Sequence, residues 1–156
     1  MLSLFLLFAA LALVVGCGAN RGISTNPRTL VEAWKLIEGY AEAESLLFVG
    51  YAAVLIDPEG RADDYTLSAY APDQGALYVL QATPSRIRFY SLPASEGQLA
   101  VPLDEIRDSP ALVQDALAER GVCRGDLSLG VNLPDDRADA LCTQPRWAVK
   151  ISPYVD

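Results

Sequence analysis

Residues 46–56 read LLFVGYAAVLI, an unbroken apolar run that is rich in residues common in β-strands. The run is short for a helix but typical of a strand, and the turn sequence DPEG follows it at residues 57–60. The pattern predicts a strand that is buried on both faces or nearly so. We expect it to be the first strand of a sheet against which the rest of the chain packs.

Three more strands are predicted beyond this turn. They span about 64–70, 76–81 and 86–92. The last of them alternates, with Ile87 and Phe89 on one face and Arg86, Arg88 and Tyr90 on the other. Turn signals about ten residues apart indicate a four-strand antiparallel meander.

Two helices are predicted, one before and one after the meander. The first begins at Asn26-Pro27, because Asn is a good N-cap and Pro suits the first helical turn. Its apolar stripe consists of Leu30, Ala33, Trp34, Ile37 and Ala41. The second begins at the sequence DSP, residues 108–110, and ends at Gly121, a residue type common just past a helix C-terminus.

The C-terminal part predicts two further strands with a polar loop between them. One strand covers about 127–131, and the other covers 146–152, where Trp147, Val149 and Ile151 point inward. Residues 132–145 are polar and contain two prolines, so we expect a loop with at most one helical turn, near Ala138. The order of helix, four strands, helix and two strands predicts an α+β fold, in which both helices pack on one face of an antiparallel sheet.

The first eighteen residues, MLSLFLLFAALALVVGCG, are apolar and contain no charge. The run from Leu2 to Val15 has the length of a signal-peptide core and is short for a bilayer-spanning helix. Its ending VVGC, residues 14–17, resembles the lipobox of bacterial lipoproteins, in which the Cys receives lipid. The resemblance implies that residues 1–16 are a signal peptide and that lipid on Cys17 anchors the protein to a membrane.

Further expectations follow from this resemblance. Residues 17–26 are expected to form a flexible tether and residues 27–156 a single domain. We expect the protein in the cell envelope, on the outer membrane facing the periplasm if the cell has two membranes, because Gly18 is not the Asp that resembles an inner-membrane retention signal. A retained signal-anchor helix stays open as an alternative, since Gly18 and Ala19 could extend the apolar run, and so does a plain secretory signal. The absence of Lys and Arg before Cys17 counts against all three interpretations.

Composition argues against several function classes. The chain has 20 acidic and 12 basic residues, a net charge of −8, which argues against nucleic acid and against an electrostatic hold on anionic lipid. It has no histidine, which excludes His-based catalysis and most zinc sites, and we expect no cofactor. If Cys17 carries lipid, Cys123 and Cys142 remain as a pair, and outside the cytoplasm such a pair indicates a disulfide.

Several segments together resemble uncharacterised bacterial lipoproteins with PepSY-like domains. They are AW at 33–34, DPEGRADDY at 57–65, SAYAP at 68–72, and IRDSPAL at 106–112 followed by Ala116-Leu117 and Gly121. The match covers roughly residues 28–122. The resemblance implies a helix, a meander and a second helix, with a role in ligand binding or in regulating peptidases outside the cytoplasm.

Five residues on two strands are candidates for a binding site. They are Arg86, Arg88 and Tyr90 on one strand and Arg146 and Lys150 on another. If the two strands are close, the set would suit a carboxylate, an anionic peptide or a glycan. The alternative is a solvated sheet face or charges that protect edge strands.

An acidic cluster follows the first strand. It consists of Asp57, Glu59, Asp63 and Asp64. Oxygen ligands suit calcium, but the EF-hand spacing is absent and strands flank the segment. We therefore interpret the cluster as an acidic hairpin turn and expect no metal.

These observations predict a lipid-anchored envelope protein with a non-catalytic, PepSY-like domain that binds a protein or small ligand. A second hypothesis is an inhibitor or chaperone of an envelope peptidase. A hydrolase is the third, because Asp and Glu are numerous, although none lies in a recognisable motif.

Overall fold

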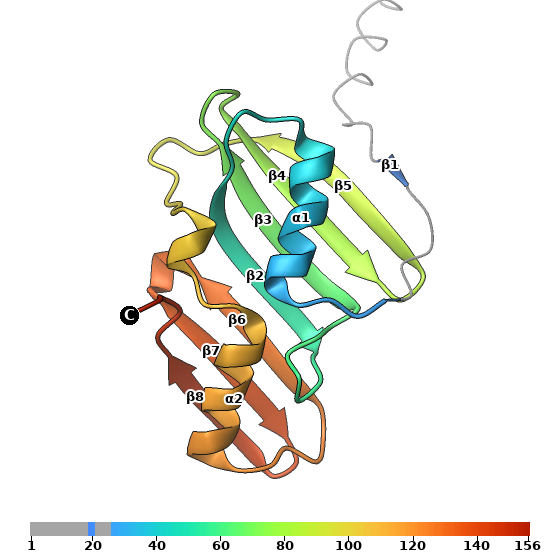
Figure 1. Ribbon diagram of the computed structural model, residues 1–156, viewed down its shortest axis with the longest axis vertical. Coiled ribbons are helices and arrows are strands. Elements are labelled where there is room, and N and C mark those ends of the chain that lie inside the picture. The colour runs from blue at the N-terminus through green and yellow to red at the C-terminus, as the bar shows by residue number, and fades with distance from the viewer. Residues whose placement is uncertain (1–18, 21–25) are drawn as a thin grey trace, which may run out of the picture.

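A computed structural model describes the backbone of residues 19–20 and all of residues 26–156 (Figure 1). The predicted signal peptide and Cys17 lie outside the described residues. The helices are α1 (Leu30–Ala41) and α2 (Ser109–Arg120), with short 3₁₀ helices η1 (Leu103–Glu105) and η2 (Leu133–Asp135). The strands are β1 (Ala19–Asn20), β2 (Leu47–Leu55), β3 (Asp64–Ala71), β4 (Ala76–Thr83), β5 (Arg86–Pro93), β6 (Leu127–Asn132), β7 (Arg137–Thr143) and β8 (Arg146–Ile151).

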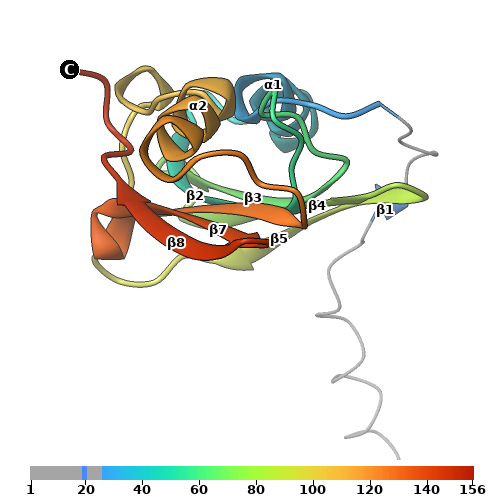
Figure 2. The ribbon, with the colours of Figure 1, turned by 90° about the horizontal axis from the view of Figure 1, so that it is seen from below.

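The described strands form one antiparallel sheet in the order β1-β5-β4-β3-β2-β6-β7-β8. β1 is a pair of residues at one edge, within the segment predicted as a tether, so the body of the sheet consists of β2 to β8. Both helices lie on the same face, α1 over the β2–β5 half and α2 over the β6–β8 half (Figure 1 and Figure 2). The predicted α+β fold, with two helices on one face of an antiparallel sheet, is confirmed.

The sheet is larger than predicted, because residues 137–143 form strand β7 instead of a loop with a helical turn near Ala138. Ala138, Ala140 and Cys142 are buried, and the residues between them are more exposed. The alternation of a strand is therefore present, but two of its three buried residues are alanines, which have low β propensity. β7 completes a second meander, β6-β7-β8.

Strand β2 lies near the middle of the sheet, but the prediction that both its faces are buried is wrong. Tyr51 and Ala53 are buried on the face that carries the helices. Ala52 and Val54 are exposed on the opposite face, and Leu55 is exposed at the end of the strand. An unbroken apolar run therefore does not imply two-sided burial in this protein.

Helix α1 begins later than predicted, because Thr29 and not Asn26 is its N-cap. The Thr29 hydroxyl accepts a hydrogen bond from the backbone N–H of Glu32 at 3.2 Å, and the Glu32 carboxylate accepts one from the Thr29 N–H at 2.9 Å. This capping box satisfies N–H groups that a helix start otherwise leaves unpaired. Arg28, which was expected inside the helix, instead forms an antiparallel bridge with Ala62.

The starts of both helices meet the turn at residues 57–62 at one point, which we call the helix-start junction. The Ser109 hydroxyl donates to the Gly60 carbonyl oxygen at 2.6 Å and accepts from the Leu30 N–H at 2.9 Å. The Asp108 carboxylate accepts from the N–H groups of Val31, at 3.0 Å, and of Ser109, at 2.8 Å. The cap predicted for the second helix is confirmed, and it also caps the first.

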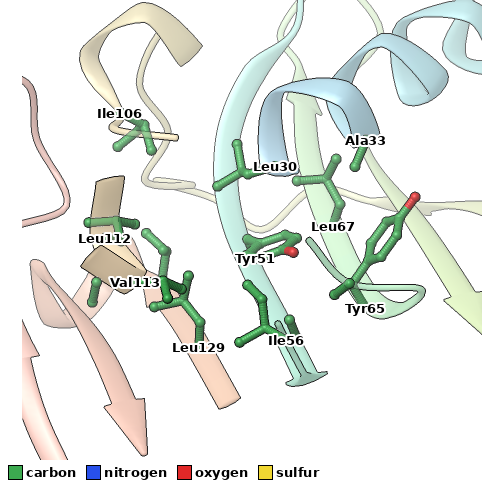
Figure 3. Close-up of a cluster of buried hydrophobic side chains, with 14 of the residues drawn as sticks. Leu30, Ala33, Tyr51, Ile56, Tyr65, Leu67, Ile106, Leu112, Val113 and Leu129 are labelled. Carbon is green, nitrogen blue, oxygen red and sulfur yellow. The ribbon is translucent and has the colours of Figure 1, made fainter. Parts of the chain in front are cut away.

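The hydrophobic core lies between the sheet and the helices and is continuous across both halves (Figure 3). Helix α1 contributes Leu30 and Ala33, and α2 contributes Leu112 and Val113. Tyr51 of β2 lies between these two pairs. Pairing of β2 with β6 joins the two helix-and-meander halves into one layered unit.

Cys123 and Cys142 form the predicted disulfide, with their Cα atoms 5.8 Å apart. Cys123 follows α2, and Cys142 lies on β7. The bond therefore ties the end of α2 to the half of the sheet that this helix covers.

Candidate functional site

The sheet has one face without helices, which we call the outer face (Figure 2). Its residues alternate along each strand with the buried residues of the core. No described segment packs over this face in the way that α1 and α2 cover the other (Figure 2). It is therefore a surface to which a partner could bind.

A hollow of about 870 Å³, which we call the outer groove, lies on this face over β2, β6, β7 and β8. Its apolar part includes Val54, Leu55 and Leu141, whose exposed fractions are 63%, 48% and 49%. Ala148 continues this lining on β8. Three large aliphatic side chains that are about half exposed at one place mark a binding surface more often than a single exposed Leu does.

Two charged side chains, Asp126 and Arg146, lie at one end of the outer groove. Asp126 is held beside β7 by Thr143, whose hydroxyl accepts the Asp126 N–H at 2.8 Å and whose own N–H donates to the Asp126 carbonyl at 3.1 Å. Within the described residues, neither the Asp126 carboxylate nor the Arg146 guanidinium takes part in an ion pair. Both groups are thus available to a bound molecule.

A second, smaller hollow of about 320 Å³ lies over the seam between β2 and β6. Its floor is made of small residues, among them Gly50, Ala52 and Gly130. Asp139 on its rim is paired with Arg137 at 3.0 Å. Because the side chains on this floor are small, the middle of the outer face is hollowed. An extended chain bound in the outer groove therefore has room to continue toward β3.

The five predicted ligand-binding residues do not form one cluster. Arg86, Arg88 and Tyr90 lie on β5, and Arg146 and Lys150 lie on β8, at the other end of the sheet order. Six strand spacings of about 4.8 Å separate β5 from β8, roughly 29 Å. The condition for a shared binding site, that the two strands are close, is therefore not met, although the charged side chains lie on the same face.

The acidic cluster after β2 behaves as a turn. The Asp57 carboxylate accepts the Arg61 N–H at 2.8 Å, and the Asp57 carbonyl accepts the Gly60 N–H at 2.9 Å. Asp57 therefore serves the geometry of the hairpin, as Asp commonly does at this position. Across the described part of the chain, no three Cys, Asp or Glu side chains are grouped so that they could hold a metal ion.

Two tyrosines are buried on the helix side, with ring centroids 6.0 Å apart. Burial raises the pKa of Tyr51, and the neighbouring Tyr65 and Asp108 raise it further. Burial also raises the pKa of Tyr65, whereas the Arg28 guanidinium lowers it. Because both rings lie in the core and point away from the outer face, we assign them to packing.

The groove residues Val54, Leu55 and Leu141 were not predicted as a site. Val54 and Leu55 belong to the run that was interpreted as fully buried, and Leu141 lies in the segment that was interpreted as a loop. A signal was present in the sequence, since large aliphatic residues next to the 57–60 turn and in a polar segment have few places to be buried.

Comparisons with protein-family models, with curated proteins and with solved structures found no match for this chain. Among the helices of the described residues, none is long and apolar enough to cross a membrane.

Proposed function

We propose that this protein is a lipid-anchored, extracytoplasmic binding protein that holds an extended, largely apolar segment of another protein in the outer groove. The observation that carries the proposal is the cluster of exposed Val54, Leu55 and Leu141 on an uncovered sheet face. Aliphatic side chains in a partner would cover these residues, and burial of apolar surface is the main driving force of such association.

The chemistry of the groove supports binding more than catalysis. Its lining offers one carboxylate, Asp126, and hydroxyls on Ser128 and Thr143. The Thr143 hydroxyl is already engaged by the Asp126 N–H. The groove lacks a second carboxylate for acid–base work, and the chain contains no histidine that could activate a hydroxyl.

The disulfide and the lipobox support an extracytoplasmic location together. A disulfide between Cys123 and Cys142 is stable in oxidising compartments and rare in the cytosol. This pairing leaves Cys17 as the remaining cysteine of the three, which is the residue that the lipobox assigns to lipid. Mass spectrometry of the purified protein tests the anchor, because a lipid-modified Cys17 at the N-terminus supports it and an intact Met1 contradicts it.

The PepSY-like assignment is also part of this proposal. It is supported by a helix followed by a meander with the 57–60 turn, and by a second helix capped at Asp108-Ser109. An inhibitor or chaperone of an envelope peptidase would bind a partner through the same groove. The groove alone does not favour that narrower role.

Site-specific photocrosslinking in cells tests the groove. A photoreactive amino acid placed at Leu141 is expected to crosslink to a defined protein, whereas the same amino acid at Ala118, exposed on α2, is not. Both positions are exposed, so neither replacement is expected to change stability by more than about 0.5 kcal/mol. Equal crosslinking at the two positions, or none at Leu141, would contradict the proposed site.

A further inference from the structure

We propose that the β5 edge of the sheet contacts the membrane, with Arg86 and Arg88 bound to anionic phospholipid headgroups and the outer groove held away from the bilayer. This inference deepens the proposed function and rests on its lipid anchor at Cys17. It assigns a role to two of the five predicted binding residues that the outer groove does not use.

The path of the chain brings the anchor to this edge. β1 pairs with β5 in antiparallel register, with Ala19 opposite Phe89 and Asn20 opposite Arg88. Cys17 precedes Ala19 by two residues, and two residues span at most about 7 Å. A lipid on Cys17 therefore brings the β5 edge within reach of the membrane surface, where Arg86 and Arg88 can contact headgroups.

Charge favours the same orientation. The strands β2 to β8 carry five basic side chains and two acidic ones, a net of +3 in a chain whose total is −8. The basic residues are Arg86, Arg88, Arg137, Arg146 and Lys150, and the acidic ones are Asp64 and Asp139. The rest of the protein is net acidic, so an anionic surface attracts the basic part of the sheet and repels the acidic turns and loops outside the strands.

Arg86 and Arg88 are free to bind headgroups. Carboxylates pair with Arg61, Arg107 and Arg137 at distances of 2.5 to 3.0 Å. Among the described residues, no ion pair involves Arg86 or Arg88, although acidic residues outnumber basic ones. Guanidinium groups that lack an internal partner bind phosphate oxygens well, because their N–H donors match that geometry.

The neighbouring residues of β5 suit a membrane interface. Tyr90 and Leu92 alternate with the core-facing residues and so lie on the same face as Arg86 and Arg88. Leu92 is 48% exposed. Tyrosine is common at the headgroup level, where its ring and hydroxyl each find a suitable environment.

The anchor also explains how an acidic protein makes this contact. Once the lipid is inserted, the contact of Arg86 and Arg88 with headgroups is intramolecular, so a weak attraction is enough to orient the domain. Five strand spacings separate β5 from β7, roughly 24 Å. An upright sheet therefore places Leu141 and the rest of the outer groove beyond the headgroup region.

Spin labels on the lipidated full-length protein test this orientation. With Cys17 modified and Cys123 bonded to Cys142, an introduced cysteine is the only free thiol of the chain. We would compare Leu92→Cys on β5, on the same face as Arg86 and Arg88, with Ala148→Cys on β8, both at exposed positions. On vesicles of phosphatidylcholine with added phosphatidylglycerol, the label at 92 is expected to lose accessibility to a soluble nickel chelate, and the label at 148 to keep it.

A pair of charge variants separates headgroup binding from the tether. Arg86→Glu with Arg88→Glu is expected to restore the accessibility of the label at 92, as is high salt. Lys35→Glu with Arg120→Glu changes the net charge equally on the helix side and is expected to leave it unchanged. Restoration by both pairs would show a general charge effect and overturn the assignment to Arg86 and Arg88.

The outcomes also distinguish this inference from the proposed function. A chain without lipid on Cys17 would overturn the anchor and this inference together. A lipidated protein whose label at 92 stays as accessible as the label at 148 would overturn only the inference. Loss of accessibility at 148 would place the outer groove against the bilayer and contradict both the orientation and the proposed use of the groove.

Discussion

The hydroxyl of Ser109 lies 2.6 Å from the carbonyl oxygen of Gly60, a residue 49 positions earlier in the chain. The same oxygen of Ser109 accepts the N–H of Leu30, 79 positions earlier. One fully buried hydroxyl thus joins the start of each helix to the turn that follows β2. The relative placement of the two helices on the sheet depends on this contact.

Replacing this hydroxyl should destabilise the protein strongly. Ser109→Ala leaves the Gly60 carbonyl without its Ser109 donor and the Leu30 N–H without its acceptor, and the expected loss in unfolding free energy is about 3 kcal/mol. Ser91→Ala, an exposed position on β5, is expected to change it by less than about 0.5 kcal/mol. Urea unfolding followed by circular dichroism measures both, and equal midpoints would contradict the role of the junction.

Replacing Gly60 should destabilise the protein for two reasons, backbone strain and steric overlap, which a control variant separates. Its φ is +77°, and a Cβ there would lie 2.4 Å from the backbone of Pro110. Gly75 has a φ of +59° with open space around it. We expect Gly75→Ala to cost about 1 kcal/mol from backbone strain alone, and Gly60→Ala to cost at least twice that. Thermal unfolding of both variants tests the difference. Similar losses of stability would show that the backbone at Pro110 moves to make room for the added Cβ.

The disulfide should stabilise the folded protein by restricting the conformations of the unfolded chain. Cys123 and Cys142 are 19 positions apart, and closing a loop of that length stabilises a protein by roughly 3 kcal/mol in the chain-entropy model. A Cys123→Ala, Cys142→Ala protein should therefore unfold at lower urea concentration. The wild type with a reductant present should match it. If reduction leaves the wild-type midpoint unchanged, the bond adds no stability.

Tyr51→Phe should not destabilise the protein, although it removes a buried polar group. The Tyr51 hydroxyl is buried and, among the described residues, has no hydrogen-bond partner, so its removal is expected to leave stability unchanged or raise it by about 1 kcal/mol at neutral pH. A loss of several kcal/mol would indicate a partner for this hydroxyl.

The same variant tests the raised pKa of Tyr51. Because the folded pKa lies above the unfolded one, near 10, the folded state keeps the proton that the unfolded chain releases. The free energy of unfolding is therefore unaffected by the titration of Tyr51 below pH 10, and it falls progressively as pH rises above 10 and the unfolded chain releases this proton. The wild type should therefore lose stability more steeply than Tyr51→Phe in alkaline urea titrations, and parallel curves would contradict the shift.

Much of the layer arrangement was predictable because it depends on local signals. The 57–60 turn, the alternation of Ile87 and Phe89, and the Asp108 cap each involve only a few neighbouring residues, and each appears in the structure. Strand β7 was missed because Ala138 and Ala140 carry a weak strand signal. The N-cap Thr29 was missed because Asn26-Pro27 offers a competing helix start.

The candidate site was not predictable in the same way. Which residues face one another across the sheet depends on strand order, and β2 pairs with β6 across more than seventy residues of sequence. That pairing brings Val54 and Leu141 to one groove and places Arg88 and Lys150 near opposite ends of the strand order, on the same face. No local pattern carries this information, since periodicity shows the face of a strand but not its neighbours.

The helix-start junction also affects when the first helix can be completed during synthesis. Leu30 and Val31 lie in the first turn of α1, but their hydrogen-bond acceptors are Ser109 and Asp108. During synthesis the chain must grow by nearly eighty residues before that turn is complete, and the apolar strands between are made first. Contacts so distant in sequence form slowly, so nascent chains should depend on chaperones until α2 has been made.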